Sequence, residues 1–282
     1  MLLKFIKLYS YVHEFFHEHF SINLKGLGFL YRRIKKDQIL IVKKKKLFLN
    51  HKIADNYGRL INGRFNEPET HLFLDFVFIN DAIKKFHFID IGCNIGEFIL
   101  DYASRPKVKH VTAFDPQPEQ IKSVKKTIEL NNFTNVTLVE KPVSNSVEEI
   151  YFNFNSNNST ASGINQSSKV GSKLLSTTID ESFEMKPDFE YVFLIDTEGA
   201  ELNILKGGHE FIQKAKPLII FEYNHVTRKC FEIDEVQEFL GNDYSIYRLR
   251  KDGCLDKNFT NTWNLVALPN KHEFAYLQKI IF

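Results

Sequence analysis

The alternation of apolar and polar residues divides the chain into a helical beginning and a long region of strands and helices. From residue 86 onward, short apolar runs are separated by amphipathic segments of helical length. Such runs predict buried strands, and strands that alternate with helices predict a parallel sheet covered on both faces. We therefore predict an α/β fold with a mostly parallel, seven-stranded sheet, whose strands span residues 86–91, 110–114, 136–139, 191–195, 218–221, 245–249 and 263–268.

Two elements are predicted before this region. Residues 2–20 carry apolar side chains at helical spacing, but charges interrupt them well short of the ~20 apolar residues that a membrane span needs. They predict an amphipathic helix that packs on the protein or on a second copy. Lying on a membrane surface is the less favoured alternative. The apolar runs 39–42 and 47–49 flank Lys43–Lys46 and predict a β-hairpin with a charged tip.

Two further segments are distinguished by their composition. Residues 66–79 predict a helix opened by Pro68, and its spacing places three apolar residues inward: Leu72, Phe76 and Ile79. Residues 153–173 are rich in Asn, Ser and Gly and nearly free of apolar residues, so they predict a mobile surface loop. Its place ahead of the fourth predicted strand makes it a candidate lid, although an insertion without function fits equally well.

The charge is distributed unevenly along the chain. The net charge is +2, yet residues 1–52 carry twelve Lys and Arg against three Asp and Glu. We therefore separate a basic N-terminal extension, 1–63, from an α/β domain, 64–282. A basic segment on an acidic body is typical of proteins attracted to an anionic surface, such as a phosphate-bearing glycan, a lipid headgroup or nucleic acid. A solvated basic face without a partner is the alternative.

The cysteines indicate a reducing compartment. They are odd in number, far apart in the sequence and match neither a disulfide framework nor a zinc motif: Cys93, Cys230 and Cys254. We expect a cytoplasmic protein, peripheral at the inner membrane if its first helix lies on lipid.

The strongest functional motif follows the first predicted strand. There the chain reads Asp90-Ile-Gly92-Cys-Asn94-Ile-Gly96 and then enters a helix. Glycines let the backbone turn sharply and approach a ligand closely. A dinucleotide fingerprint would need G-x-G-x-x-G, which this loop lacks. The loop therefore suits a ligand without a pyrophosphate, with Asp90 as acceptor for its ammonium group.

A second acidic residue supports this interpretation. Asp115 ends the second predicted strand, 19 positions beyond Gly96. Rossmann-like folds hold a ribose diol with an acid at this place, because one carboxylate accepts hydrogen bonds from both hydroxyls. Asp115 alone, before Pro116, would also suit a helix cap.

These motifs together resemble the FkbM family of methyltransferases. The resemblance rests on D-x-G-x-N-x-G, FDPQP, LIDTEGAELNILKGG and KPLIIFEYN, and it extends over roughly residues 64–268, including the Asn66-Glu67-Pro68 entry. It implies a Rossmann-like class I methyltransferase fold, S-adenosylmethionine as methyl donor and an oxygen acceptor on a sugar or polyketide. It also implies a set of residues that line the cofactor: Asp90, Gly92, Asn94, Gly96, Asp115, Pro142 and Asp196. One departure stands out, because the family commonly has lysine where this chain has Leu194.

A group of acids follows the fourth and fifth predicted strands. Asp196 ends the fourth strand, Glu198 follows it, and Glu222 ends the fifth. Carboxyl ends of parallel strands face the ligand crevice. A sugar hydroxyl needs a base to take its proton, so we predict Asp196 as general base, with Glu198, Glu222 and His225 as alternatives. Acids in the first turn of a helix are also stabilised without any catalytic role.

Three alternatives remain open at this level. Asp196, Glu222 and Asn224 carry hard oxygen ligands that suit Mg²⁺, although a metal is the less favoured hypothesis. A nucleic-acid acceptor is favoured by the basic extension, but the fourth strand does not end in the (D/N)-P-P-(Y/F) run of amino-methylating enzymes. The loss of the usual lysine at Leu194 also allows a non-catalytic scaffold that binds the cofactor.

Overall fold

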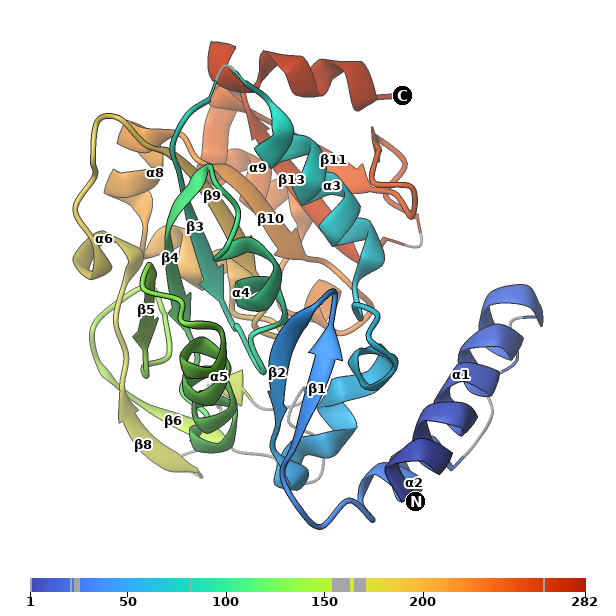
Figure 1. Cartoon of the computed structure of the whole chain (residues 1–282). Helices are drawn as coiled ribbons and strands as arrows, with labels where there is room; N and C mark the ends of the chain where they lie inside the picture. The colour runs from blue at the N-terminus through green and yellow to red at the C-terminus, as the bar shows by residue number, and fades with distance from the viewer. Residues whose placement is uncertain are drawn as a thin grey trace.

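A mixed β-sheet forms the centre of the molecule, with helices on both faces (Figure 1). The computed structural model describes residues 2–20, 22, 26–81, 83–153, 163–164, 171–260 and 262–282. Among these residues the main sheet has eight strands in the order β12-β11-β13-β10-β9-β3-β4-β5. Their bounds are β3 (Phe86–Ile91), β4 (Val108–Phe114), β5 (Val136–Val139), β9 (Glu190–Ile195), β10 (Leu218–Glu222), β11 (Tyr244–Leu249), β12 (Leu255–Asp256) and β13 (Asn264–Pro269).

The predicted seven strands and the α/β fold class are confirmed. Strands β5, β4, β3, β9 and β10 are parallel, and β13 joins β10 in antiparallel register. The two-residue strand β12 adds a short edge beside β11. The chain reverses its direction of travel across the sheet between β3 and β9, which is where open α/β sheets bind ligands.

Alternate residues of the strands enter two separate cores. Phe88 packs on the side covered by α3 (Pro68–Ile79), α4 (Glu97–Tyr102), α5 (Pro118–Asn131) and the C-terminal η5 (His272–Ile280). Ile89 and Ile91 pack on the other side, which is covered by four helices: α6 (Ile179–Ser182), α7 (Glu201–Lys206), α8 (His209–Ala215) and α9 (Ile233–Leu240). The sheet is therefore buried on both faces, as its continuous apolar strands require.

Helix α3 is present where the sequence predicts it, but its predicted inward face is wrong. Leu72, Phe76 and Ile79 are 45, 41 and 75% exposed. The residues that pack on the sheet lie at the intervening positions: Phe73, Leu74, Val77 and Phe78. The helix is apolar around most of its circumference, so spacing alone does not select one face, and the sheet makes that choice.

The N-terminal extension packs against the α/β domain. It contains α1 (Leu2–Phe20), α2 (Leu27–Tyr31), the hairpin strands β1 (Gln38–Val42) and β2 (Lys45–Leu49), and η1 (His51–Asn62). Its apolar side chains share a third core with Ile95 and Leu100 of the domain. The backbone N–H of Phe48 donates to Thr127 Oγ1 on α5 at 3.1 Å. The boundary near residue 63 thus separates two segments that form one packed unit.

The predicted hairpin is confirmed, with a shorter tip than the four lysines suggest. Lys43 and Lys44 alone form the turn, with φ angles of 44° and 69°. Lys45 and Lys46 pair with Val42 and Ile41 as part of β2. Two-residue turns with positive φ match the twist of the strands that they join, which explains why the ladder extends into the lysine run.

A small antiparallel sheet includes parts of the segment predicted as a loop. It is built from β6 (Glu149–Asn153), β7 (Gly163–Ile164) and β8 (Ser172–Leu175). These strands include the ends of the 153–173 segment, while residues 154–162 and 165–170 lie outside the described part of the chain. The lid therefore stays a prediction.

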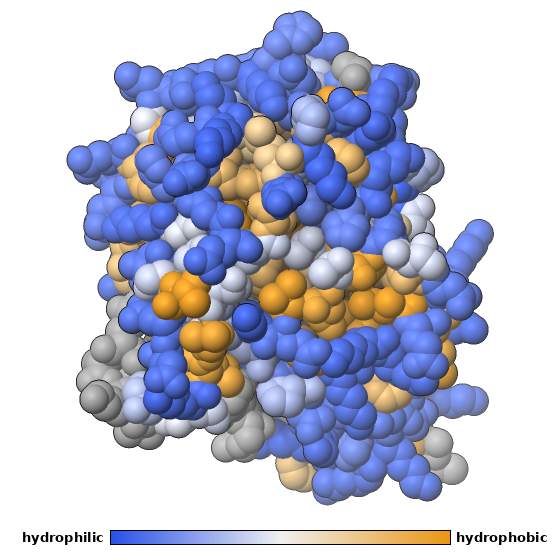
Figure 2. Space-filling model, turned by 90° about the vertical axis from the view of Figure 1, so that its left-hand side faces the viewer, coloured by the Kyte–Doolittle hydropathy of each residue, from blue (hydrophilic) through white to orange (hydrophobic). Residues whose placement is uncertain are grey.

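Hydrophilic and apolar residues are unevenly distributed over the surface. The face on the left of Figure 1 is mostly hydrophilic, with apolar residues gathered in patches across its middle and lower parts (Figure 2). Helix α1 lies at the opposite edge of the molecule (Figure 1). Within the described residues, no helix combines the length and the apolar character needed to cross a bilayer.

Candidate active site

The carboxyl ends of four parallel strands bring most of the predicted site residues to one edge of the sheet. Asp90 lies near the end of β3, Asp115 follows β4, Asp196 follows β9 and Glu222 ends β10. Pro142, which follows β5 at the same edge, is buried, and its carbonyl accepts the Thr177 N–H at 2.9 Å.

The glycine corner after β3 is wedged against the loop after β9. Gly92 has a φ of 90°, Asn94 of 47° and Gly96 of 79°. A Cβ atom added to Gly92 would lie 1.8 Å from the carbonyl oxygen of Asp196. Only glycine permits this conformation and this close approach. The corner therefore joins the predicted cofactor loop directly to the predicted base.

Asp115 holds the glycine corner in place from the neighbouring strand. Its Oδ2 accepts the Asn94 N–H at 2.9 Å, and its Oδ1 accepts the Gln117 N–H at 2.8 Å. Burial raises the pKa of Asp115 to about 7, against the effect of these two hydrogen bonds. Each carboxylate oxygen has a second lone pair, so Asp115 retains the capacity to accept from a ribose diol.

Asp90 is a buried carboxylate with an unsatisfied oxygen. The residue is 1% exposed, and its Oδ2 has no hydrogen-bond partner among the described residues. Burial, and then the charges of Glu67 and Asp115, raise the pKa of Asp90 well above its usual range. A buried acceptor of this kind is costly unless a donor approaches it. The orphaned oxygen fits the ammonium group of an amino-acid ligand.

Three carboxylates form a cluster beside this corner. One oxygen each from Asp196, Glu198 and Glu222 lie within 4.8 Å of one another. Burial, and then the charge of Glu222, raise the pKa of Asp196 well above its usual range. Burial and the charge of Glu198 raise the pKa of Glu222 to about 8. Carboxylates this close cannot all ionise at neutral pH, so the cluster shares protons and can accept one.

The residues around the carboxylate cluster differ in their contacts. Glu201 Oε1 accepts from Thr197 N at 2.9 Å and from Gly199 N at 3.2 Å, so this acid shapes the loop that carries Glu198. The Asn224 amide donates to Glu222. His225 is exposed to solvent on the loop after β10.

The alternative metal set is only partly assembled. Asn224 Oδ1 accepts the backbone N–H groups of Val226 at 2.6 Å and Thr227 at 3.2 Å. That amide oxygen is therefore engaged with its own loop, and the structure places Glu198 with Asp196 and Glu222 in its stead.

Glu67 is a site residue that the sequence reasoning missed. Its Oε2 accepts from Thr70 Oγ1 at 3.1 Å and from Asn264 Nδ2 at 3.0 Å. Burial and the charge of Glu97 raise the pKa of Glu67 to about 7. The charge of Glu67 in turn contributes to the raised pKa of Asp196, so the two acids interact. The sequence feature that could have identified Glu67 is the Asn66-Glu67-Pro68 segment, which is part of the family resemblance.

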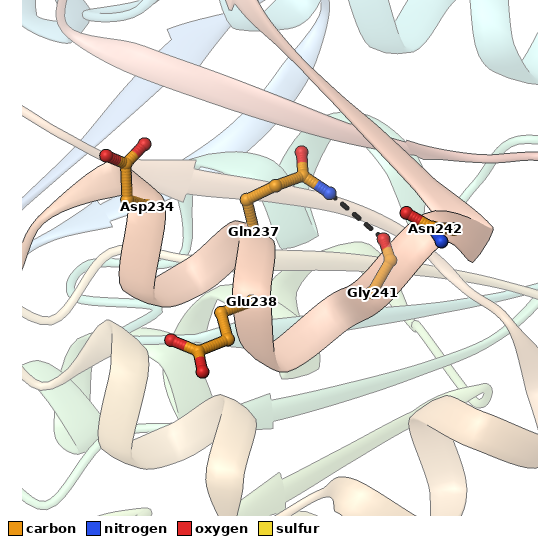
Figure 3. Close-up of a pocket in the computed structure, with 5 residues that line it drawn as sticks. All are labelled: Asp234, Gln237, Glu238, Gly241 and Asn242. Atoms are coloured by element: carbon orange, nitrogen blue, oxygen red, sulfur yellow. Dashed lines mark hydrogen bonds between the residues drawn. The ribbon is translucent and has the colours of Figure 1, made fainter.

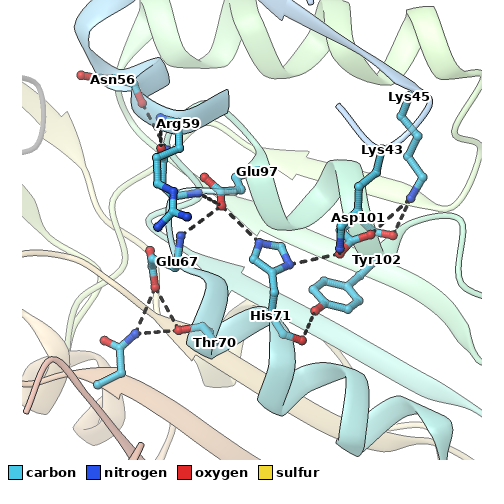
Figure 4. Close-up of polar contacts among 12 residues, drawn as sticks. Lys43, Lys45, Asn56, Arg59, Glu67, Thr70, His71, Glu97, Asp101 and Tyr102 are labelled. Atoms are coloured by element: carbon cyan, nitrogen blue, oxygen red, sulfur yellow. Dashed lines mark hydrogen bonds and ion pairs between the residues drawn. The ribbon is translucent and has the colours of Figure 1, made fainter. Parts of the chain in front are cut away.

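A buried polar network contacts the Asn66-Glu67-Pro68 segment (Figure 4). His71 Nε2 lies 3.2 Å from Glu97 Oε1, and His71 Nδ1 lies 3.1 Å from Asp101 Oδ2. Glu97 Oε1 also accepts the Asn66 N–H at 2.7 Å. Lys45 Nζ, from the hairpin, lies 3.6 Å from Asp101 Oδ1. The network connects the basic extension to the segment that carries Glu67.

A separate pocket lies on α9, lined by Asp234, Gln237, Glu238, Gly241 and Asn242 (Figure 3). Gln237 donates to the carbonyl of Gly241 at 3.0 Å and to that of Tyr244 at 3.2 Å. Tyr244 begins β11, which runs in the same direction as β10. This pocket therefore lies toward the edge of the sheet opposite the carboxylate cluster.

The family model described as Methyltransferase FkbM domain matches residues 90–249, more than half of the chain. A methyltransferase FkbM from Methylobacillus flagellatus KT aligns with a TM-score of 0.46 at 15% identity, over 78% of this chain and 55% of that one. This chain thus spans about half the length of that protein.

Two other solved structures align over most of both chains. M. jannaschii TYW2 in complex with AdoMet has a TM-score of 0.44 at 14% identity, covering 82% of this chain and 84% of that one. SMU.1697c from Streptococcus mutans, a putative methyltransferase in complex with SAH, has a TM-score of 0.42 at 14% identity, covering 72% and 99%. A search of curated proteins found no match.

Proposed function

Because this chain belongs to the methyltransferase FkbM domain family, we propose that it is an S-adenosylmethionine-dependent methyltransferase that methylates a hydroxyl group of a sugar, in a surface glycan or its precursor. The observation that carries this proposal is the carboxylate cluster of Asp196, Glu198 and Glu222 at the ligand edge of the sheet. Alcohols need a base at neutral pH, and raised carboxyl pKa values supply one with a suitable strength.

The residues at the glycine corner fit the cofactor. S-adenosylmethionine, when bound, supplies an electrophilic methyl carbon on a positively charged sulfur. The orphaned Oδ2 of Asp90 suits its ammonium group, and Asp115 suits its ribose diol. Gly92 and Gly96 allow the backbone to approach it closely, and the family resemblance places Pro142 near the adenine.

Asp196 is the proposed general base. It lies directly after β9, against the glycine corner, so an acceptor hydroxyl bound at this edge would be near both the proposed cofactor loop and the cluster. Glu222 and Glu198 raise the proton affinity of the shared site, because each added negative charge disfavours further ionisation. Positioning the acceptor in line with the reacting carbon contributes much of the remaining acceleration.

The acidic crevice argues against a nucleic-acid acceptor. Phosphate groups bind to basic surfaces and are repelled by clustered carboxylates. The cluster has Glu67 as a fourth interacting acid. The excess of basic over acidic residues lies in the extension instead, since residues 1–52 carry twelve Lys and Arg against three Asp and Glu. We place the reaction in the cytoplasm, where cysteines such as the free Cys230 and Cys254 stay reduced.

The test is transfer of a labelled methyl group. The full chain is incubated with methyl-labelled S-adenosylmethionine and, separately, carbohydrate extracts, lipid-linked glycans and RNA. We expect label in a carbohydrate fraction, its loss with Asp196→Asn, and its retention with the matched control Glu238→Gln on α9. Label in RNA would transfer support to the nucleic-acid alternative, and cofactor binding without any labelled product would support the scaffold.

A further inference from the structure

Helix α1 has one face that is packed and one that is not. Ile6, Ser10 and Glu14 follow one another at four-residue spacing and are all buried. Tyr31 Oη donates to Ser10 Oγ at 3.3 Å, and Arg64 Nη1 donates to Glu14 Oε2 at 2.7 Å. This face attaches the helix to the rest of the extension.

The opposite face is apolar and exposed. Its side chains are more than one-third exposed although they are large and mostly aromatic: Phe5 (54%), Leu8 (64%), Tyr11 (59%), Val12 (36%) and Phe15 (45%). Phe29 on the adjacent α2 is 61% exposed as well. Large apolar side chains gathered on one exposed helix face mark an interaction site.

Exposed basic side chains lie on α1 itself and directly after α2. Lys4 on α1 is exposed, and so is the group that follows α2, namely Arg32, Arg33, Lys35 and Lys36. The Arg33 guanidinium lies 4.5 Å from the centre of the Phe29 ring, so charge and apolar surface are adjoining. The acidic Glu14 is turned inward and paired with Arg64. The exposed face therefore combines apolar and positive character, as interfacial membrane helices do.

We propose that α1 docks on the surface of an anionic lipid bilayer, with Phe5, Leu8 and Phe15 in the headgroup–acyl boundary and the basic residues against lipid phosphates. A second copy of the chain is a poorer occupant, because a two-fold contact would bring the same basic residues of both copies together. The proposal concerns where the enzyme works and does not depend on the identity of the acceptor.

The experiment is co-sedimentation of the full chain with vesicles. Phosphatidylcholine vesicles are compared with vesicles containing phosphatidylcholine and phosphatidylglycerol at about 7:3, because basic residues near an anionic surface strengthen binding. We expect partitioning to the anionic vesicles that weakens with salt. The double variant Leu8→Glu with Phe15→Glu should reduce it at least tenfold. The matched control Ile79→Glu, at an exposed apolar position on α3, should not.

The other outcomes of this experiment either support or overturn the proposal. The proposal is overturned if the wild type stays in the supernatant with anionic vesicles, or if the Leu8→Glu and Phe15→Glu variant, folded by its Tm, sediments as well as the wild type. A dimer in analytical ultracentrifugation that this variant dissociates, without any change in vesicle binding, would assign the face to self-association. Arg32→Gln with Arg33→Gln should remove the preference for anionic over neutral vesicles.

Discussion

Asp90 on β3 is paired in register with Leu194 on the neighbouring strand β9. In a parallel sheet, register partners point to the same face, so the two side chains are neighbours. The family commonly has lysine at this position, and here a buried leucine lies beside a buried carboxylate whose Oδ2 has no partner among the described residues. A lysine at this position would have offered Asp90 a countercharge from β9, and Leu194 offers none.

This arrangement makes Asp90→Asn informative. We expect affinity for S-adenosylmethionine to fall about tenfold or more, because a charge-assisted hydrogen bond contributes about 1.5–3 kcal/mol. The thermal stability of the free protein should hold or rise, because burial disfavours the charged form of Asp90 and raises its pKa, and its Oδ2 has no partner among the described residues. Calorimetric titration and a melting curve measure the two effects. Unchanged affinity would remove Asp90 from the cofactor site.

Gly92→Ala should disrupt the corner between β3 and β9. Its new Cβ would lie 1.8 Å from the Asp196 carbonyl oxygen, at a φ of 90°. Strain at such a position costs about 1–3 kcal/mol before the clash is added. Gly241→Ala is the control, because its φ is also positive but no atom lies within 4 Å of its added Cβ. We expect a lower Tm for both variants and loss of cofactor binding for Gly92→Ala alone.

The rate of methyl transfer should rise with pH through neutrality. The cluster that contains the proposed base Asp196 must lose a proton before it can accept one, and the pKa values of its other two members, Glu198 and Glu222, are raised to about 7 and about 8. The rate should therefore increase between about pH 6.5 and pH 8.5 and then level. Asp196→Asn should lower kcat by about 10²–10⁴. A flat profile over this range for the wild type would contradict a carboxylate base.

His71→Ala should destabilise the whole fold. Burial lowers the pKa of His71, but hydrogen bonds and charges from Asp101 and Glu97 outweigh it and raise that pKa. Removing one member of a buried ionic network costs about 3–5 kcal/mol, because its partners lose their compensation. Urea unfolding measures the change, with the exposed His272→Ala as control. A decrease of less than about 1 kcal/mol in the free energy of unfolding would mean that the network is not needed for stability.

Chelation of divalent metals should leave the rate unchanged. The cluster of Asp196, Glu198 and Glu222 has a spacing that a cation would accept, yet the Asn224 amide already donates to Glu222. Carboxylates with raised pKa values can act as base without a metal. The measurement is methyl transfer after dialysis against EDTA, with Mn²⁺ titration of the dialysed protein. Loss of activity that Mg²⁺ restores would establish a metal centre here.

The sequence by itself was sufficient for seven of the eight strands in the described main sheet and for the glycine corner at residues 90–96. Parallel strands buried on both faces are continuous apolar runs, so segments such as 191–195 and 218–221 are recognised by composition alone. The Asp90–Gly96 loop is equally local, because its acid and its two glycines lie within seven consecutive residues. The placement of Asp196 and Glu222 at one edge then follows from strand direction.

Only the tertiary structure decided which side chains meet across distant segments. Glu67 joins the acids near Asp196, Leu194 lies beside Asp90, and α3 turns Phe73 rather than Leu72 toward the sheet. Helix α1 likewise has apolar residues on several sides, and packing against the rest of the extension selected which of them stay exposed. Periodicity specifies an element and its period, but the choice among similar faces depends on the surface that each element packs against.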